Sequence, residues 1–189
     1  MFDKHAIPTR LLWVDLETTG LDPQKDVILE VVALVTDFNF KILASYKALI
    51  KQDQKTVEQR MQLNNWWEKY PKNRKLFLRS IKNGVPLKQA EQDLIKLIDQ
   101  YFKAEPAILA GNSIHYDRTY IRHWWPALNQ KLHYRMLDVT TLKIIMQGKY
   151  GIDFKGKETH RALDDIQESI TELRYYLKWL RKDCDKNQS

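Results

Sequence analysis

The chain has 189 residues, 43% of them hydrophobic and 29% charged, which suits one globular domain with its own core. We expect a single domain over residues 1–189, with its core at about 10–182 and a polar tail at 183–189. No stretch approaches the roughly 18 apolar residues of a membrane span, and the first ten residues lack the apolar centre of a secretory signal. We therefore expect a cytoplasmic protein that makes no membrane contact.

Charge and cysteine content narrow the possible partners. Lys and Arg number 31 against 24 Asp and Glu, and this excess of positive charge favours a polyanionic partner. Residues 69–88 carry seven Lys and Arg and no acid, so this segment is either a phosphate-binding patch or a solvated face. The single cysteine, Cys184, excludes an intrachain disulfide and a cysteine-based zinc cluster, which fits a reducing compartment.

The predicted elements begin with strands. Residues 10–17, 26–37 and 40–50 are strand-like, and the turn residues between them predict an antiparallel meander. Helical spacing begins at about residue 55 and is clearest at 87–102, which predicts one apolar stripe. That stripe comprises Ala90, Leu94, Leu97, Ile98 and Tyr101.

Helices and strands alternate in the second half. We expect a buried strand at 106–114, a helix at about 117–128, a short strand at 132–139, a short helix at 140–148 ended by Gly148, and a long amphipathic helix at 160–182. Strands first, then helices interleaved with strands, predict an α/β domain in which helices flank a mixed β-sheet.

Two acids project from one face of the first strand. Because side chains alternate along a strand, Asp15 and Glu17 lie on the same face as Trp13. Two adjacent carboxylates repel each other, and the usual remedies are a shared proton, a basic partner or a divalent cation. An isolated Asp-x-Glu pair, however, most often lies at a solvated strand end.

A third acid, Asp117, lies on the apolar face of its predicted helix, because Ile121, Trp124 and Leu128 follow it at the spacing of one stripe. An acid in a first helical turn can equally be an N-cap that accepts from the helix's own amides. Both interpretations stay open for this residue.

The last helix supplies a fourth acid. Its apolar stripe, at 100° per residue, puts Asp165 at the flank of the core and Asp164 in solvent. This stripe comprises Ile166, Ile170, Leu173, Leu177 and Leu180. His160, at or before the helix start, would in isolation be a surface residue. Four acids beside the core without a matching arginine indicate metal ions.

Three motifs carry a resemblance to a known family. DLETTGL at 15–21, GNSIHYDR at 111–118 and HRALDD at 160–165 resemble the exonuclease motifs of the DEDD superfamily, in its histidine-containing branch. From about residue 10 to 180 the chain is similar to the oligoribonuclease family. Thr18 stands where that family usually has methionine, so the first motif also looks like that of general DEDD exonucleases. His115 and Tyr116 stand where the family has glycine and glutamine.

The resemblance implies a ribonuclease-H-like fold, a homodimer, and 3′-to-5′ hydrolysis of short single-stranded RNA to 5′-mononucleotides with two divalent cations, Mg²⁺ or Mn²⁺. It implies that the metal ligands are Asp15, Glu17, Asp117 and Asp165, and that His160 is the general base. It also implies a set of substrate contacts. These are Leu21 as a wedge between bases, Trp66 as a stacking partner, Ser113 on a phosphate, Tyr134 as a base contact in the partner subunit's site, and Arg135 and Thr140 near the terminal phosphate.

Two alternatives remain open. A DEDD exonuclease that trims or proofreads longer RNA or DNA could use the basic segment 69–88 and the six tryptophans, because lysine tracks and aromatic stacking bind long single strands. The second alternative is a nucleic-acid-binding module that has kept the fold but has no hydrolytic activity. Loss of hydrolysis on chelation of metal separates an enzyme from such a module, and a length series of substrates separates the two enzymes.

Overall fold

A computed structural model of the chain describes residues 8–103, 105–156 and 161–186. Five strands form one sheet in the order β3-β2-β1-β4-β5. Their bounds are β1 Arg10–Thr18, β2 Ile28–Asp37, β3 Ile42–Leu49, β4 Ala107–Gly111 and β5 Leu132–Asp138. The first three strands pair antiparallel, whereas β4 and β5 run parallel to β1. The predicted meander and mixed sheet are therefore confirmed.

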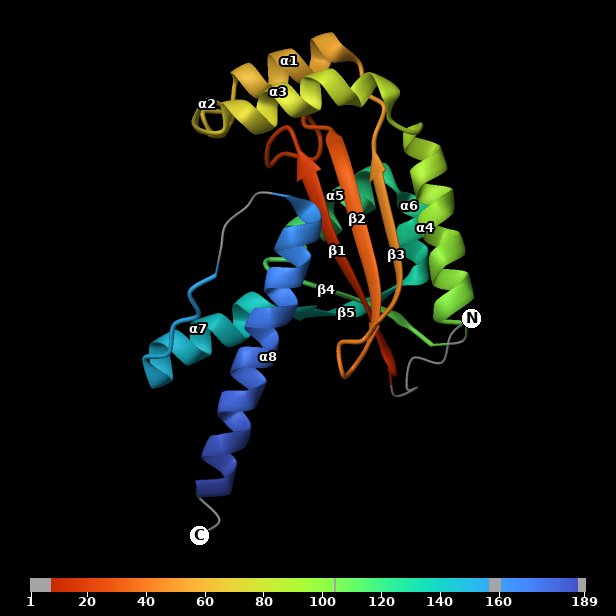
Figure 1. Ribbon diagram of the computed structural model, residues 1–189. Coiled ribbons are helices and arrows are strands. Elements are labelled where there is room, and N and C mark those ends of the chain that lie inside the picture. The colour runs from red at the N-terminus through yellow and green to blue at the C-terminus, as the bar shows by residue number, and fades with distance from the viewer. Residues whose placement is uncertain (1–7, 104, 157–160, 187–189) are drawn as a thin grey trace.

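Helices cover both faces and one end of the sheet (Figure 1). Their bounds are α1 Gln54–Gln62, α2 Trp66–Lys69, α3 Pro71–Ser80, η1 Ile81–Asn83, α4 Leu87–Tyr101, α5 His115–Trp124, α6 Pro126–Lys131, α7 Val139–Tyr150 and α8 Ala162–Lys186. Helices α4, α5 and α6 pack on one face, and α7 and α8 pack on the other. Helices α1 to α3 form a third small core over the end of the sheet where β1 finishes (Figure 1). No helix in the described ranges is long and apolar enough to cross a membrane.

Strand β1 is the centre of the molecule, because both of its faces are buried. Leu12 and Val14 contact the core shared with α4 and α5, while Leu11 and Trp13 contact the core shared with α7 and α8. This alternation confirms the predicted faces and directs Asp15 and Glu17 to the α8 side. The acids of the site therefore extend from a strand that is packed on both of its faces.

Several predicted boundaries are wrong. The single helix expected at 117–128 is two helices that meet at Trp125, whose ψ of 63° is not helical because Pro126 follows it. Helix α7 runs through Gly148 and ends at Tyr150. Its C-cap, Gly151, adopts the left-handed conformation (φ 64°) that glycine tolerates. Strand β4 stops at Gly111 rather than 114, and the chain then turns through Ser113, whose φ is 49°.

The last helix also differs from its prediction. It begins at Ala162 and continues to Lys186, beyond the expected core boundary at 182. Leu177, expected in the apolar stripe, is exposed, and Tyr176 is buried in its place. Ile166, Ile170 and Leu173 are buried as predicted, so the buried face departs from the predicted stripe only after Leu173.

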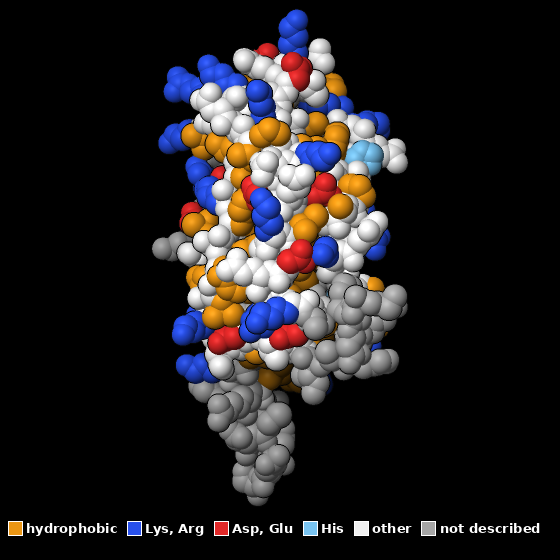
Figure 2. All heavy atoms as spheres, turned by 90° about the vertical axis from the view of Figure 1, so that its right-hand side faces the viewer, with side chains coloured by type: hydrophobic (Ala, Val, Ile, Leu, Met, Phe, Trp, Pro, Cys, Tyr) orange, Lys and Arg blue, Asp and Glu red, His pale blue; other side chains and the backbone are white. Residues whose placement is uncertain are grey.

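The basic segment 69–88 spans the end of α2, all of α3 and the start of α4. Lys and Arg side chains gather at the end of the molecule that carries α1 and α3, as Figure 2 shows for one face. Lys72, Lys75 and Arg79 are exposed, whereas Phe77 anchors α3 in the core beneath them. This placement fits a solvated face and a phosphate-binding patch equally.

Candidate active site

Three acids converge where β1 meets the first turn of α8. Asp15 and Glu17 project from the same face of β1, and Asp165 projects from α8, which packs along that face. One carboxylate oxygen from each of the three lies within 4.8 Å of the others. All three side chains are partly buried. The exposed neighbour Asp164 points away, as the helical periodicity predicts.

Asp117 approaches the same place from α5. Its Oδ1 accepts a hydrogen bond of 2.9 Å from the Leu16 amide of β1. Ile114 occupies the N-cap position of α5, and its side chain makes no capping hydrogen bond. The Asp117 carboxylate is thus tied to the strand that carries Asp15, so an N-cap role alone does not account for its placement. Asp117 is not part of the tight group formed by Asp15, Glu17 and Asp165.

The electrostatics of these acids are unfavourable without a cation. Burial, followed by the charges of Asp165 and Glu30, raises the pKa of Asp15 to about 7. Burial and the charge of Asp15 likewise raise the pKa of Glu17 to about 8. Burial is also the main reason that the pKa of Asp117 lies well above its usual range, although the Leu16 amide opposes the rise. Clustered carboxylates of this kind fit hard divalent cations, which prefer oxygen ligands.

A fifth acid, Glu30, was missed in the sequence. It lies on β2 directly across from Glu17, is buried, and forms a 3.1 Å ion pair with Lys47 of β3. Its Oε2 is buried and has no hydrogen-bond partner. An acid inside the apolar run 27–35 was the available signal, because buried carboxylates are rare unless they are paired.

The acids open onto a polar cavity of about 580 Å³. Its lining includes Asp15, Asp165, Asn112, Lys143, Gln147, Asp153, Lys155, Glu168 and Glu172. The buried Glu172 accepts hydrogen bonds from Asn112 Nδ2 (2.9 Å) and Tyr176 Oη (2.8 Å), and Lys143 lies 3.6 Å from it. The sequence did not indicate this group because its members come from three separate segments, the end of β4, α7 and α8. A metal-binding acid cluster beside lysines suits the hydrolysis of an anionic ester.

A second cavity of about 210 Å³ adjoins Glu17 from the other side. Its wall combines Leu21, Trp66 and Trp67 with the polar side chain of Asn64. Leu21 is 72% exposed although it is apolar, while Trp66 packs against Trp67 (4.7 Å between ring centroids) and Tyr70 (4.5 Å). The structure therefore brings the predicted wedge and the predicted stacking residue to one pocket beside an acid.

Ser113 and Thr140 are brought together between β4 and α7. Their hydroxyl oxygens lie 3.2 Å apart, and the Ser113 amide donates to Thr140 Oγ1 and to Asp138 Oδ1, both at 2.9 Å. Asp138 is also the N-cap of α7. Ser113 needs a positive φ to make this turn, a strained conformation that is typical of functional sites.

Tyr134 and Arg135 are not brought to the acids within this chain. Tyr134 and Arg135 lie exposed on the edge strand β5, with the guanidinium 5.3 Å from the centroid of the ring. They line neither the 580 Å³ nor the 210 Å³ cavity. His160 lies outside the described residues.

Comparisons with known proteins agree with this geometry. Residues 12–173 match the RNase_T exonuclease family. Oligoribonuclease of Corynebacterium glutamicum (strain R) is 42% identical over 172 residues, covering 88% of this chain and 78% of that protein. Oligoribonuclease of Francisella tularensis subsp. novicida (strain U112) is 38% identical over 170 residues, covering 88% and 93%.

Solved structures with a similar fold include exonuclease I. The enzyme from Methylocaldum szegediense matches with a TM-score of 0.58 at 14% identity, covering 87% of this chain. E. coli exonuclease I in complex with a dA16 oligonucleotide matches with a TM-score of 0.56 at 12% identity, also covering 87%. The chain spans only 39% and 40% of the length of these two proteins, and at this identity the likeness concerns the fold.

Proposed function

The chain belongs to the RNase_T exonuclease family and, within it, to the oligoribonucleases, and from this we propose that it degrades very short single-stranded RNA. It is a 3′-to-5′ exoribonuclease with a ribonuclease-H-like fold, and its products are 5′-mononucleotides. The observation that carries the proposal is the convergence of Asp15, Glu17 and Asp165, with Asp117 tied to the same strand. The enzyme completes RNA degradation by hydrolysing the short fragments that remain after longer strands have been degraded.

The enzyme depends on divalent metal, and we infer two ions, Mg²⁺ or Mn²⁺, held by Asp15, Glu17, Asp117 and Asp165. When bound, such ions lower the pKa of an attacking water and stabilise the leaving oxygen. The four carboxylates would hold these ions at the end of β1. His160 holds the proton taken from the water, since a neutral imidazole can accept it near pH 7 and a ligating carboxylate cannot.

Substrate is held on both sides of the acids. The exposed side chain of Leu21 inserts between the two bases, and Trp66 stacks on the base in the 210 Å³ pocket. This use is supported by the apolar wall that these residues share beside Glu17. Ser113 and Thr140 offer paired hydroxyls to a phosphate.

A second copy of the chain completes the site in this proposal. Strand β5 is an edge strand, and an apolar groove of about 400 Å³ adjoins it, lined by Leu11, Phe38, Phe40, Met136, Leu142, Leu177 and four neighbours. Exposed edges and apolar patches favour association. A homodimer through this face would carry Tyr134 and Arg135 into the partner's site. A variant that remains monomeric should then be poorly active, and a fully active monomer would contradict the shared site.

Arg135→Ala should weaken the preference for short RNA. A guanidinium can bind a terminal phosphate in a bidentate manner, and the extra charge of that phosphate distinguishes an end from an internal linkage. We expect kcat/KM for a 5′-phosphorylated dinucleotide to fall about 10-fold or more, and that for a long RNA to fall less. Arg122→Ala, which removes an exposed arginine from α5, is the matched control. Equal losses on both substrates would refute a length-measuring role for Arg135.

Hydrolysis of a 5′-phosphorylated RNA dinucleotide and of a long single-stranded RNA, with Mg²⁺ or Mn²⁺ and with chelator, tests the proposed function. Fast metal-dependent cleavage that favours the dinucleotide is expected. A preference for the long strand would assign the chain to trimming or proofreading and give the basic segment 69–88 a role in binding. Hydrolysis that persists in chelator would contradict the metal mechanism.

Two further expectations stay predictions. We infer that residues 1–189 form one exonuclease domain. This inference is supported by the single sheet, because α4 to α8 pack on its two faces and α1 to α3 pack over one of its ends. We also infer a cytoplasmic location, which is supported by a single cysteine. Fractionation of the cells that make the protein checks the second expectation.

A further inference from the structure

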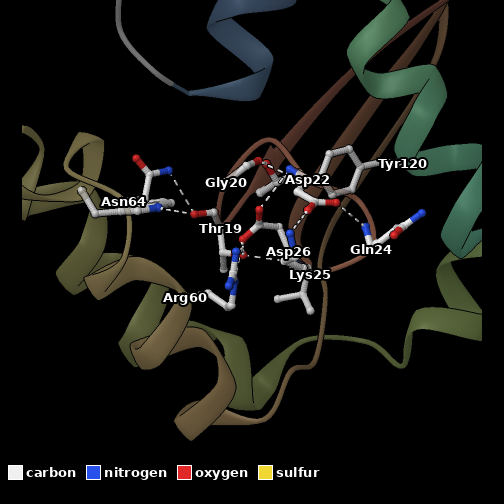
Figure 3. A network of polar contacts seen from close by, with 12 residues as sticks. Thr19, Gly20, Asp22, Gln24, Lys25, Asp26, Arg60, Asn64 and Tyr120 are labelled. Atoms are coloured by element: carbon white, nitrogen blue, oxygen red, sulfur yellow. Dashed lines mark hydrogen bonds and ion pairs between the residues drawn. The ribbon is translucent and has the colours of Figure 1, made fainter.

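The loop between β1 and β2, which carries Leu21, is held from three helices (Figure 3). The Gly20 carbonyl accepts a hydrogen bond from Tyr120 Oη of α5 at 2.9 Å. The Thr19 carbonyl accepts from Trp67 Nε1 of α2 at 2.9 Å. Both peptide groups that precede Leu21 are therefore fixed by buried side chains from outside the sheet.

Asp26 is the centre of this arrangement (Figure 3). Its Oδ1 accepts from Thr19 Oγ1 and from Arg60 Nε of α1, both at 2.9 Å, and its Oδ2 accepts from the Asp22 amide at 3.0 Å. Asp26 is only 3% exposed. A buried carboxylate requires charged and hydrogen-bonded partners, and Arg60 supplies the charge while the loop supplies the other donors.

Gly20 shows how closely the loop closes over this carboxylate. A Cβ atom at position 20 would lie 2.5 Å from Asp26 Oδ2, which is too close for any side chain. The loop thus wraps the Asp26 carboxylate on one side, and Leu21 is left projecting on the other with 72% of its surface exposed. Because the backbone of Leu21 is held rigidly, its apolar side chain can contact a ligand without being displaced.

We propose that Arg60 and Asp26 are positioning residues that brace Leu21 as the wedge between the two bases of the substrate. The proposal rests on the proposed function, because it takes Leu21 to be that wedge. Arg60 lies 34 residues from Asp26 along the chain and joins the loop to α1, whose inner face is anchored in the core by Val57 and Met61. Removal of Arg60 leaves the metal-binding acids unchanged, but it allows the β1–β2 loop, and Leu21 with it, to move when the bases bind.

Two substrates distinguish a loss of Leu21 positioning from a general loss of activity. A 5′-phosphorylated RNA dinucleotide has two bases to be separated, whereas the p-nitrophenyl ester of thymidine 5′-monophosphate has one and reports the chemistry alone. Arg60→Ala should raise KM for the dinucleotide about 10- to 100-fold, the range typical of small displacements in a binding site. Its kcat for the dinucleotide, and its kcat/KM for the ester, should stay near wild type. Arg60→Lys, which keeps a cation able to reach Asp26, should recover most of the loss.

A double-mutant cycle with Leu21→Ala tests whether Arg60 acts through the wedge. If it does, Leu21→Ala and the double variant Leu21→Ala/Arg60→Ala should have the same KM for the dinucleotide, because the brace has nothing left to hold. Lys25→Ala is the control. Lys25 forms an exposed 2.7 Å ion pair with Asp22 in the same loop, so this variant removes the same charge without loosening Asp26 and should behave as wild type.

The proposal is overturned if Arg60→Ala behaves as Lys25→Ala does, if the dinucleotide and the ester lose equally, or if the losses of Leu21→Ala and Arg60→Ala add. The ester also corrects for any fall in the folded fraction, so an unstable variant still gives an answer. Failure of the proposed function is distinct from these outcomes, because there the wild-type protein itself would not prefer the dinucleotide.

Discussion

Asp15→Asn should reduce hydrolysis at least about 100-fold while making the metal-free protein more stable at pH 8. The loss is expected because Asp15 belongs to the acid cluster that we propose as the metal site, and a bound metal supplies several kcal/mol of transition-state stabilisation. The gain in stability is expected because the same carboxylate is buried and is also close to the charges of Asp165 and Glu30. A neutral amide of the same shape avoids the cost of burying a charge and removes that repulsion.

The stability gained by Asp15→Asn should increase as the pH rises. The pKa of Asp15 is about 7 and that of Glu17 about 8 in the folded state, against model-compound values of 3.8 and 4.5. Between these limits the folded protein binds more protons than the unfolded chain, so the free energy of unfolding falls as pH rises from about 4 to about 8. The metal-free wild type should therefore lose stability across this window, and Asp15→Asn should lose less.

Thermal unfolding in chelator at pH 5 and pH 8, together with kcat in Mg²⁺ or Mn²⁺, measures both effects. Added metal should raise the melting temperature of the wild type more at pH 8 than at pH 5, because cations and protons compete for the same oxygens. Asp164→Asn, which changes the exposed neighbour of Asp165, should match wild type in every measurement. An Asp15→Asn protein that is active, or less stable than wild type at pH 8, would contradict the metal assignment.

The parts of the site that could be predicted from sequence rest on local periodicity. Alternation along β1 separated Asp15 and Glu17 from Leu12 and Val14 because a strand reverses its side chains at every residue. Helical spacing separated Asp165 from Asp164 for the same kind of reason. The motifs then supplied the common role of these acids, which periodicity alone left open.

The parts that could not be predicted depend on contacts between distant segments. Nothing near Asp26 in the sequence indicates that Arg60, on another element, neutralises it. Glu30 stands out as an acid in an apolar strand, but its partner Lys47 is identified only by the register of β2 with β3. The break of the α5–α6 segment at Trp125 had a local signal, the following proline, which the apolar stripe outweighed in the prediction.

His160→Ala should lower kcat about 100-fold or more, the usual contribution of a general base, and leave KM for the dinucleotide nearly unchanged. The described histidines are engaged elsewhere. His115 lies 3.6 Å from Asp138, His123 packs on Trp124, and His133 is buried in β5, where its Nδ1 accepts from the Arg135 amide. None of these three lines the cavity that contains Asp15 and Asp165.

The pH profile of kcat distinguishes a proton acceptor from a residue that only shapes the site. In the proposed mechanism bound metal keeps the acids deprotonated. At saturating Mg²⁺ or Mn²⁺ the acidic limb of the wild-type profile should therefore reflect the imidazole, with a midpoint near its ordinary pKa of about 6.5. His160→Ala should remove that limb and leave a slow, flatter profile, and His115→Ala should keep it. A variant that lacks His160 and still turns over near the wild-type rate would mean that another group accepts the proton, and the carboxylates of the cavity would then be the first to examine.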